Sequence, residues 1–390
     1  MAATRGVLTR PRRSSLNALL HAALALPIIP IAARAGALEG SSVGMRWQDY
    51  REDGGRMSIS EPLLWIKAPL GDDYEIFASR VIDSISGASP RLVTNQSGVP
   101  VQTLSGASII DRRRAADVKV TRRFEQVSIA VSRAVSFEKD YVSYAGSIEA
   151  KLELNEKNTT LVVVKGMSND RVGSVDNPAL SERRDTREYL AGITQLLSPV
   201  SLLQSNVSVS RGSGFYNDPY KFTLSFPSGG QAPILFADRR PAERNQIAWL
   251  TRYRHYFRDA SAALQAEYRY FRDSWGIRAH TIEAAWNQTL SDQWKIVPSL
   301  RYYSQSSADF YRPVVGNPLP ETSSSDQRLA AFGGFAPGIK AIYAFGNGTV
   351  VDAGYSLYRQ RAGWKSGGGG SAEFTPFNAR YFIVGVTHQF

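Results

Sequence analysis

Cysteine is absent from this chain, and histidine is scarce, with four residues in 390. The absence of cysteine excludes a disulfide framework and any thiolate metal site. The four histidines form no pair at ligand spacing, and there is no acidic loop of the calcium-binding type. We therefore expect no dedicated metal site and no cofactor, and the sequence gives little support to an enzyme.

Long hydrophobic runs are also missing beyond residue 40. No segment there approaches the roughly 18 to 20 apolar residues that a membrane-spanning helix needs. A helical membrane protein is thereby excluded, so any membrane role of this part of the chain must use β-strands or an anchor.

The N-terminal residues have the pattern of a secretory signal. Four arginines precede the apolar stretch LNALLHAALALPIIPIAA, and Ala33-Arg34-Ala35 has the small-x-small pattern of a cleavage site. We predict a cleaved signal peptide over 1–35, with an N-terminal anchor as the alternative. Cleavage would remove five arginines and no acidic residue, and so lower the formal net charge from +11 to +6. Much of the basic balance thus belongs to the leader, and we expect no nucleic-acid partner.

From about residue 43 onward, apolar and polar residues alternate, which is typical of strands whose two faces meet different surroundings. In 141–154 and 261–273 the alternation is nearly complete. A soluble β-sandwich would also alternate, but most of these segments are longer than the roughly 5 to 6 residues usual in soluble sheets. They approach the roughly 9 to 11 residues of tilted membrane strands.

Tight and long connections alternate along the chain. Long Gly-, Ser-, Pro- and Asn-rich stretches fall at 87–111, 168–186, 213–244, 306–327 and 363–376, with short turns between the other segments. Short turns on one rim and long loops on the other are typical of bacterial outer-membrane barrels. We predict an all-β fold over 43–390: a transmembrane, antiparallel, up-and-down β-barrel of about sixteen strands, to within two, in the outer membrane of a Gram-negative bacterium.

The segment YFIVGVTHQF at 381–390 is predicted to be the last strand of this barrel. Its outward face is predicted to carry Phe382, Val384, Val386 and Phe390. The pattern resembles the C-terminal signal that barrel-assembly machinery recognises. His388 departs from it, since it lies on the same face where another apolar residue is more usual.

Tryptophans are expected to mark the lipid interface as an aromatic girdle. Trp286 and Trp294 fall on the outward parity on either side of the turn at 291–292. Further candidates for the girdle are Trp65, Trp249, Trp275 and Trp364.

Several longer stretches resemble a bacterial family known as domain of unknown function 3570, which is regarded as a family of outer-membrane β-barrels. They are DSISGASP (83–90), SFEKDYVS (136–143), NEKNTT (155–160), YFRDSWGIRAHT (270–281), RYYSQSSADFY (301–311) and SSDQRLAAFG (324–333). The resemblance implies the barrel fold and carries no activity with it.

The inward parity of the predicted strands is rich in charge. A barrel of about sixteen strands encloses water unless loops fill it, so these residues are expected to line the lumen. The lumen-lining candidates are Arg252, Arg254, Glu267, Arg269, Asp273, Glu283, Lys295, Arg301, Asp117, Lys119, Arg123, Glu149 and Lys151. They either select solutes by charge or neutralise one another and brace the wall.

A ligand site at the lumen mouth is a further hypothesis, formed by Asp309, Tyr311 and Arg312 with His280. The main prediction is a channel or a transport or export component with a water-filled, charge-lined lumen. The alternatives are a non-conducting scaffold or surface receptor that binds a lipoprotein or exported protein through 87–111 and 213–244, and an outer-membrane enzyme acting at the mouth. Outer-membrane lipid, lipopolysaccharide and the assembly machinery are the expected partners.

Overall fold

The computed structural model describes residues 40–87, 90–96, 99–104, 109–226, 232–316 and 318–390, with only the backbone described over 85–111. The predicted signal peptide, 1–35, lies outside the described residues. Within the described part, no helix is long and apolar enough to span a membrane.

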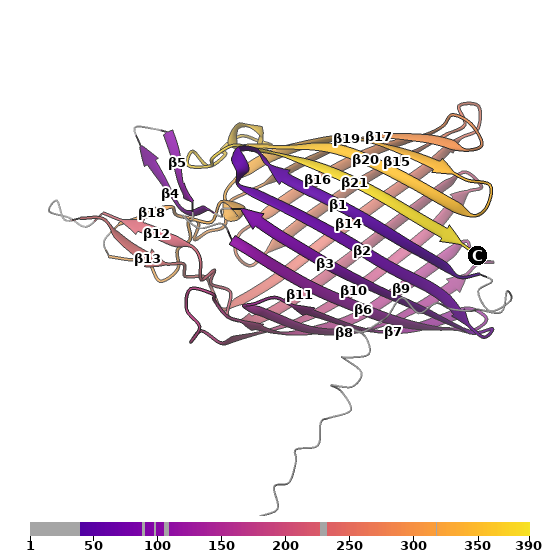
Figure 1. Ribbon diagram of the computed structural model, residues 1–390, viewed down its shortest axis with the longest axis horizontal. Helices are drawn as coiled ribbons and strands as arrows, with labels where there is room; N and C mark the ends of the chain where they lie inside the picture. Colours follow the sequence, from indigo (N-terminus) through magenta and orange to yellow (C-terminus); the bar gives the residue numbers. More distant parts are fainter. Residues whose placement is uncertain (1–39, 88–89, 97–98, 105–108, 227–231, 317) are drawn as a thin grey trace, which may run out of the picture. The chain divides into compact units, whose positions relative to one another are not determined.

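Sixteen antiparallel strands form a closed barrel, as predicted (Figure 1). Each wall strand pairs with its neighbour along the chain, and β1 pairs with β21 to close the ring. The wall strands are β1 (Ser42–Glu52), β2 (Met57–Leu70), β3 (Tyr74–Gly87), β6 (Ile109–Arg123), β7 (Val127–Phe137), β8 (Tyr141–Leu154), β9 (Thr159–Val172), β10 (Glu182–Ser198), β11 (Ser201–Gly214), β14 (Glu243–Phe257), β15 (Ala262–Asp273), β16 (Arg278–Thr289), β17 (Trp294–Gln305), β19 (Phe332–Ala344), β20 (Thr349–Arg361) and β21 (Phe377–Gln389).

Two strands extend well beyond their predicted ends. The sequence predicted a long connection over 168–186, whereas β9 continues to Val172 and β10 begins at Glu182. The added residues are polar on both faces, for example Asn169 and Asp170. A strand that rises above the lipid has water on both sides, so the alternating signal disappears although the hydrogen-bonded ladder continues.

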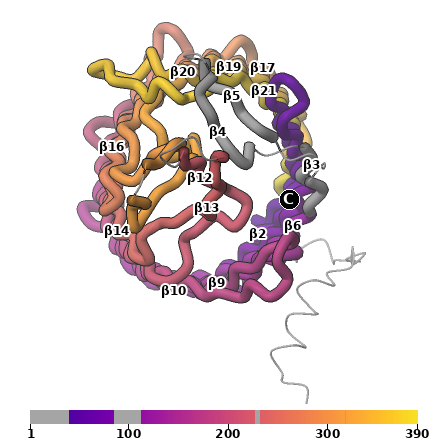
Figure 2. The backbone as a smooth tube through the Cα atoms, turned by 90° about the vertical axis from the view of Figure 1, so that its left-hand side faces the viewer, coloured from indigo at the N-terminus to yellow at the C-terminus, as the bar shows by residue number. Residues whose placement is uncertain are grey.

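The predicted long loops contain structure of their own. One holds the hairpin of β4 (Pro90–Gln96) and β5 (Val99–Leu104), and two others contribute a small sheet of β12 (Phe222–Ser225), β13 (Ile234–Ala237) and β18 (Val314–Val315). Short 3₁₀ turns are η1 (Asp53–Gly55), η2 (Gln327–Leu329) and η3 (Ala362–Trp364). Figure 2, which looks onto the loop end, shows β12 and β13 across part of the opening. The loop end is called the outer rim below, and the opposite end the turn rim.

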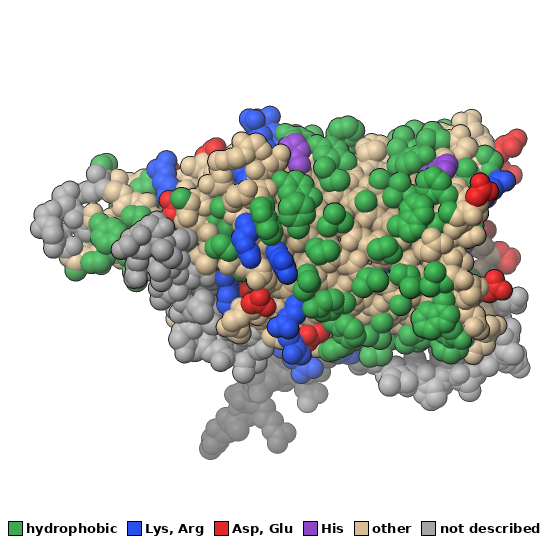
Figure 3. All heavy atoms as spheres, turned by 90° about the horizontal axis from the view of Figure 1, so that it is seen from above, with side chains coloured by type: hydrophobic (Ala, Val, Ile, Leu, Met, Phe, Trp, Pro, Cys, Tyr) green, Lys and Arg blue, Asp and Glu red, His purple; other side chains and the backbone are tan. Residues whose placement is uncertain are grey.

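The outer face of the wall is apolar between the two rims. Its exposed side chains include Met45, Val131, Ile148, Val163 and Ile339. Figure 3 shows hydrophobic side chains over most of this face and basic side chains gathered toward the loop end. An apolar band of this kind is the surface that a lipid bilayer requires of a barrel.

The aromatic girdle is only partly as predicted. Trp294 lies outward at the turn rim against Tyr343, with ring centroids 4.8 Å apart. Trp65 faces inward instead, since it lies opposite Gly44 on the inward face, and a side chain at Gly44 would meet its ring. Trp275 is 2% exposed within the outer loops. Alternation alone did not separate wall aromatics from aromatics buried by loops.

The terminal strand has the predicted parity. Val386 pairs with Met45, and the exposed outer face includes Phe382 (38%) and Phe390 (48%). His388 is accommodated because its Nδ1 lies 2.9 Å from Thr349 Oγ1 on the neighbouring strand. The imidazole therefore meets a polar partner at the turn rim.

Candidate functional site

A row of four charged residues crosses the inner face of four neighbouring strands, with two glutamates between two arginines. The register places Arg252, Glu267, Glu283 and Arg301 directly beside one another, on β14 to β17 in that order. Arg252 donates to Glu267 Oε2 through Nε at 2.8 Å and Nη2 at 2.5 Å. Two carboxylates opposite each other would repel, and the ion pair of Arg252 with Glu267 reduces this repulsion.

The remaining candidates of this group share the same inner face. Arg254 donates to the amide oxygen of Gln265 at 2.9 Å. Asp273 is fully buried and accepts from Arg244 Nη2 at 2.6 Å. Arg269 lies beside Thr281, and its guanidinium carbon is 5.7 Å from the centre of the Phe271 ring.

The second group of candidates, on β6 and β8, is also inward-facing and is largely paired within the wall. Glu149 Oε1 lies 3.0 Å from Lys119 Nζ and 3.2 Å from Lys151 Nζ. The other contacts join Arg123 to Glu75 and Asp117 to the Ser79 hydroxyl. This side of the lumen therefore neutralises its own charge.

Inward-facing cations without a carboxylate partner are concentrated on one side of the wall. Among the described residues, those with no ion pair within 4.0 Å on β14 to β19 are Arg254, Arg269, Lys295, Arg301 and Lys340. On the remaining described wall, Arg46 is the only inward cation of this kind. The lumen thus has one basic side and one side of matched charges.

The outer loops pack into the mouth next to this basic side. Trp275 and Ile277 form an apolar cluster with Ala308, Phe310 and Leu329 of the loop at 306–331. A second cluster joins the loop residue Ala330 and the wall residue Phe332 to Phe374 of the loop at 362–376. Burial of these side chains holds the loops against the wall.

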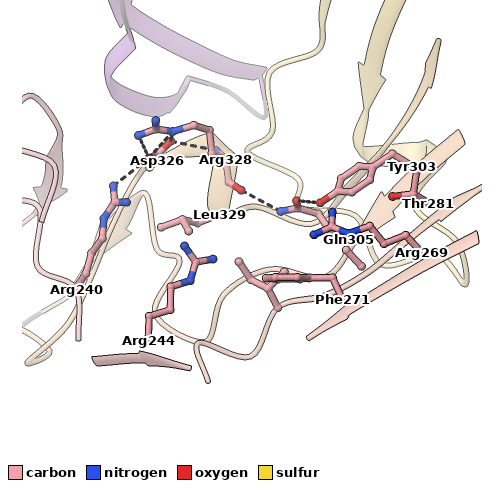
Figure 4. Close-up of a pocket in the computed structure, with 12 residues that line it drawn as sticks. Arg240, Arg244, Arg269, Phe271, Thr281, Tyr303, Gln305, Asp326, Arg328 and Leu329 are labelled. Carbon is pink, nitrogen blue, oxygen red and sulfur yellow. Dashed lines mark hydrogen bonds and ion pairs between the residues drawn. The ribbon is translucent and has the colours of Figure 1, made fainter. Parts of the chain in front are cut away.

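A cavity of about 370 Å³ lies between the loop at 306–331 and the strands β14 to β17 (Figure 4). Four arginines line it, two from the wall and two from the loops, together with aromatic and polar side chains. The polar and aromatic lining residues are Arg240, Arg244, Arg269, Arg328, Phe271, Thr281, Tyr303, Gln305 and Asp326. Its two wall arginines, Arg244 and Arg269, belong to strands of the basic side.

Asp326 connects the two loops that meet above this cavity. Its side chain, 3% exposed, lies 3.0 Å from Arg240 Nη2 and accepts from Arg328 Nε at 2.8 Å. Burial alone would raise the pKa of the Asp326 carboxyl, but Arg328 and Arg240 outweigh it and hold that pKa well below its usual range. Asp238 also accepts a hydrogen bond from Arg240, through Nε at 2.6 Å. Its pKa shifts in the opposite direction, because burial raises it more than Arg240 lowers it.

The predicted mouth ligand site is not assembled as expected. His280 faces outward, where its Nδ1 lies 2.8 Å from Tyr268 Oη, because its strand position shares the parity of the apolar wall residues. Asp309 and Arg312 line a separate hollow of about 260 Å³ at the rim. Tyr311 is packed into both apolar clusters, and burial raises its pKa. The prediction of His280 as a member of this site was wrong.

Sequence reasoning missed the loop cluster around Asp326, although a signal was present. Asp238-Arg239-Arg240 and Asp326-Gln327-Arg328 share the pattern Asp-x-Arg, and the two segments meet through Arg240 and Asp326. Both lie in loops whose spatial relation does not follow from strand parity. Among the described residues, no group of three His, Asp or Glu side chains is placed to hold a metal ion.

Solved structures with a similar fold are outer-membrane barrels. A bacterial polysaccharide outer membrane secretin is 10% identical, with 90% of this chain and 99% of that chain covered and a TM-score of 0.49. CdiB from Acinetobacter baumannii is 8% identical over 90% of this chain and 60% of its own, with a TM-score of 0.50. A ferric enterobactin receptor from Pseudomonas aeruginosa is 10% identical over 89% of this chain and 59% of its own, with a TM-score of 0.47. These likenesses concern the fold alone.

The family comparison covers nearly all of the wall. No curated protein matches the sequence. The model of the family described as protein of unknown function, DUF3570, matches residues 16–183 and 176–381. With the closed sixteen-stranded barrel and the stretches that resembled this family, the match shows that the chain belongs to the DUF3570 family.

Proposed function

We propose that the protein is an outer-membrane channel that passes small hydrophilic solutes and weakly favours anions. The observation that carries this proposal is the concentration of unpaired inward cations on β14 to β19, opposite a side whose charges are paired. Charged groups fixed in a narrow aqueous path change the local concentration of ions of each sign. Because acidic residues also face the lumen, the expected preference is mild.

The mouth determines the proposed size limit. The loops at 306–331 and 362–376 are fixed to the wall by apolar clusters, so solutes would pass beside them and through the arginine-lined part of the lumen. Outward-facing Phe382, Val386 and Phe390 support insertion by the barrel-assembly machinery into the outer membrane.

Planar-bilayer recording of the refolded protein in a salt gradient tests the proposal. We expect conductance steps and a reversal potential that shows mild anion preference. The double variant Arg254→Gln plus Arg301→Gln should shift the reversal potential toward cations, since two unpaired lumen charges are removed. The matched control is Arg122→Gln on the outer face of β6, which should leave it unchanged. An inserted barrel without conductance, or a double variant with wild-type selectivity, would contradict the proposal.

A second candidate function, a surface receptor or scaffold for an exported protein or lipoprotein, is supported by the small loop sheet. That sheet and the residue after β12 leave apolar side chains exposed, with Leu235 at 55% and Phe226 at 56%. Absence of conductance together with specific cross-linking of one exported protein at position 235, lost on Leu235→Asp, would favour this alternative.

A further inference from the structure

Arginines oppose one another directly on the outer face of the barrel. The register pairs Arg171 with Arg183 on β9 and β10, and Arg187 with Arg211 on β10 and β11. All four side chains are exposed, and they lie toward the outer rim on the parity of the apolar wall. Side chains directly opposite in an antiparallel pair have Cβ atoms about 4.5–5.5 Å apart, and like charges there are destabilising.

Neither of these pairs is neutralised by a carboxylate of the described chain within 4.0 Å. Asp185 lies between them on β10, but its carboxylate accepts a hydrogen bond from Asn169. Two further outward pairs are Arg272 with Arg278 and Arg51 with Arg380, and the latter shows the contrast. There Asp49 lies 2.7 Å from Arg51 and Asp53 lies 3.8 Å from Arg380. The pairs on β9 to β11 therefore present their charge to an external anion.

An apolar hollow of about 500 Å³ adjoins these arginines on the outer wall. Tyr189 and Val209, which line it, are two residues along the strand from Arg187 and Arg211. The hollow is formed because alanines stand between larger side chains, and its lining is Ile148, Ala150, Val163, Val164, Lys165, Tyr189, Leu190, Ala191, Val207 and Val209. Its apolar character suits an acyl chain, since it lies on the outward face of the wall.

Lys165 is the single charged residue among those that line the hollow. A lysine that faces lipid at mid-depth is costly, and its long aliphatic stem lets the ammonium reach toward the head-group level. Lys165 lies opposite Tyr189, and the next outward position on its strand, Met167, lies opposite Arg187. The ammonium thus has a short path to the same anion that the arginines face.

We propose that the outer face of β8 to β11 is a binding site for a phosphorylated glycolipid of the outer leaflet, with one acyl chain in the hollow and phosphate between the arginine pairs. Guanidinium groups bind phosphate through paired charge-assisted hydrogen bonds. The placement is specific to one rim: at the turn rim the outward Arg122 stacks on Tyr74 and Phe124 instead. The site rests on the proposed outer-membrane location, and it is independent of whether the lumen conducts.

Native mass spectrometry of the refolded full chain in detergent, titrated with bisphosphorylated lipid A, tests the site. Removal of one pair, Arg187→Gln plus Arg211→Gln, should weaken binding about thirtyfold, from the contribution of each arginine near an anionic lipid surface. Ala191→Trp, which fills the hollow, should weaken the binding of lipid A without altering any charge. Arg122→Gln is the matched control and should bind as the wild type does. Heat-modifiable migration of every variant shows that the barrel has formed.

Three results would overturn the site: wild-type affinity in both the arginine and the Ala191→Trp variants, equal binding of lipid A without phosphates, or equal binding of phosphatidylglycerol. A failure here is distinct from a failure of the channel proposal. A variant barrel that conducts normally and still binds lipid A as the wild type does refutes only the site, whereas a lipid-binding barrel without conductance refutes only the channel.

Discussion

Replacement of Asp326 by Asn should release the loop at 306–331 from the mouth. The wild-type carboxylate is buried and holds Arg240, which is 10% exposed, and Arg328, which is 70% exposed. A hydrogen bond to a charged group contributes about 1.5–3 kcal/mol, whereas a largely exposed pair contributes about 0–1 kcal/mol. Since Arg240 keeps Asp238, we expect a loss of about 2 kcal/mol in the local free energy of loop opening, or about thirtyfold in its equilibrium.

Hydrogen–deuterium exchange measures this opening at the loop's own backbone bonds. The amides of Ala308 and Arg312 donate to Leu329 and Ser324, so their protection reports the closed loop. In Asp326→Asn, protection should fall about thirtyfold while the wall strands keep theirs, because local opening does not require the barrel to unfold. Asp309→Asn is the matched control, since Asp309 is exposed, lies in the same loop and has no ion pair among the described residues.

The stabilisation of the closed loop by Asp326 should depend on pH in a defined direction. Burial opposes ionisation of Asp326, but its arginine partners lower its pKa below the ordinary value of about 4. A lowered pKa means that the stabilisation is fully present above the unfolded value and is lost only as pH falls through the folded value. The difference between wild type and Asp326→Asn should therefore be constant from pH 7 to about pH 4 and shrink below that. Equal protection in the two proteins at pH 7, or an equal loss in Asp309→Asn, would refute the reasoning.

Three further predictions concern the barrel itself. Lys157 has a φ of 68° in the turn between β8 and β9, so Lys157→Gly should raise the free energy of unfolding by about 1 kcal/mol, measured from urea midpoints in detergent; no change would show that the turn is unstrained. Gly44→Val should lower it by about 1–3 kcal/mol, because a Cβ there meets the Trp65 ring, and Gly44→Val plus Trp65→Ala should recover part of the loss; additive losses would argue against the contact. Deletion of Phe390 should reduce the heat-modifiable, membrane-inserted fraction in cells, and normal insertion would contradict its assembly role.

The wall could be predicted from the sequence because a barrel strand has only two faces. Once Leu264 and Tyr268 are placed toward lipid, Glu267 and Arg269 must face inward, and hairpin pairing brings them beside Arg252 and Glu283. The strand number and the closing strand followed from the same rule. The same rule places His280 on the outward face of its strand, so its assignment to the ligand site at the mouth could have been avoided.

The mouth could not be predicted in the same way. Arg240 and Asp326 are far apart in the sequence and lie in loops, where no period of two fixes the direction of a side chain. Trp275 was assigned to the lipid interface, although Phe310 and Leu329 bury it. These two residues belong to another loop, so the sequence alone does not show that they cover it. The apolar hollow on the outer face of β8 to β11 could likewise not be predicted from the sequence, because it arises from alanines on neighbouring strands and not from a pattern along one strand.

The pairing of Ser42 with Gln389 sets the order of events in biogenesis. β1 precedes all other strands of the wall in the sequence, yet one of its edges has no partner until β21 has been made. Until that moment the growing chain carries an unpaired edge, which is a template for misassociation. The edge of β1 therefore stays open for as long as the rest of the wall is being synthesised, and closure of the ring by β21 is the step that removes it.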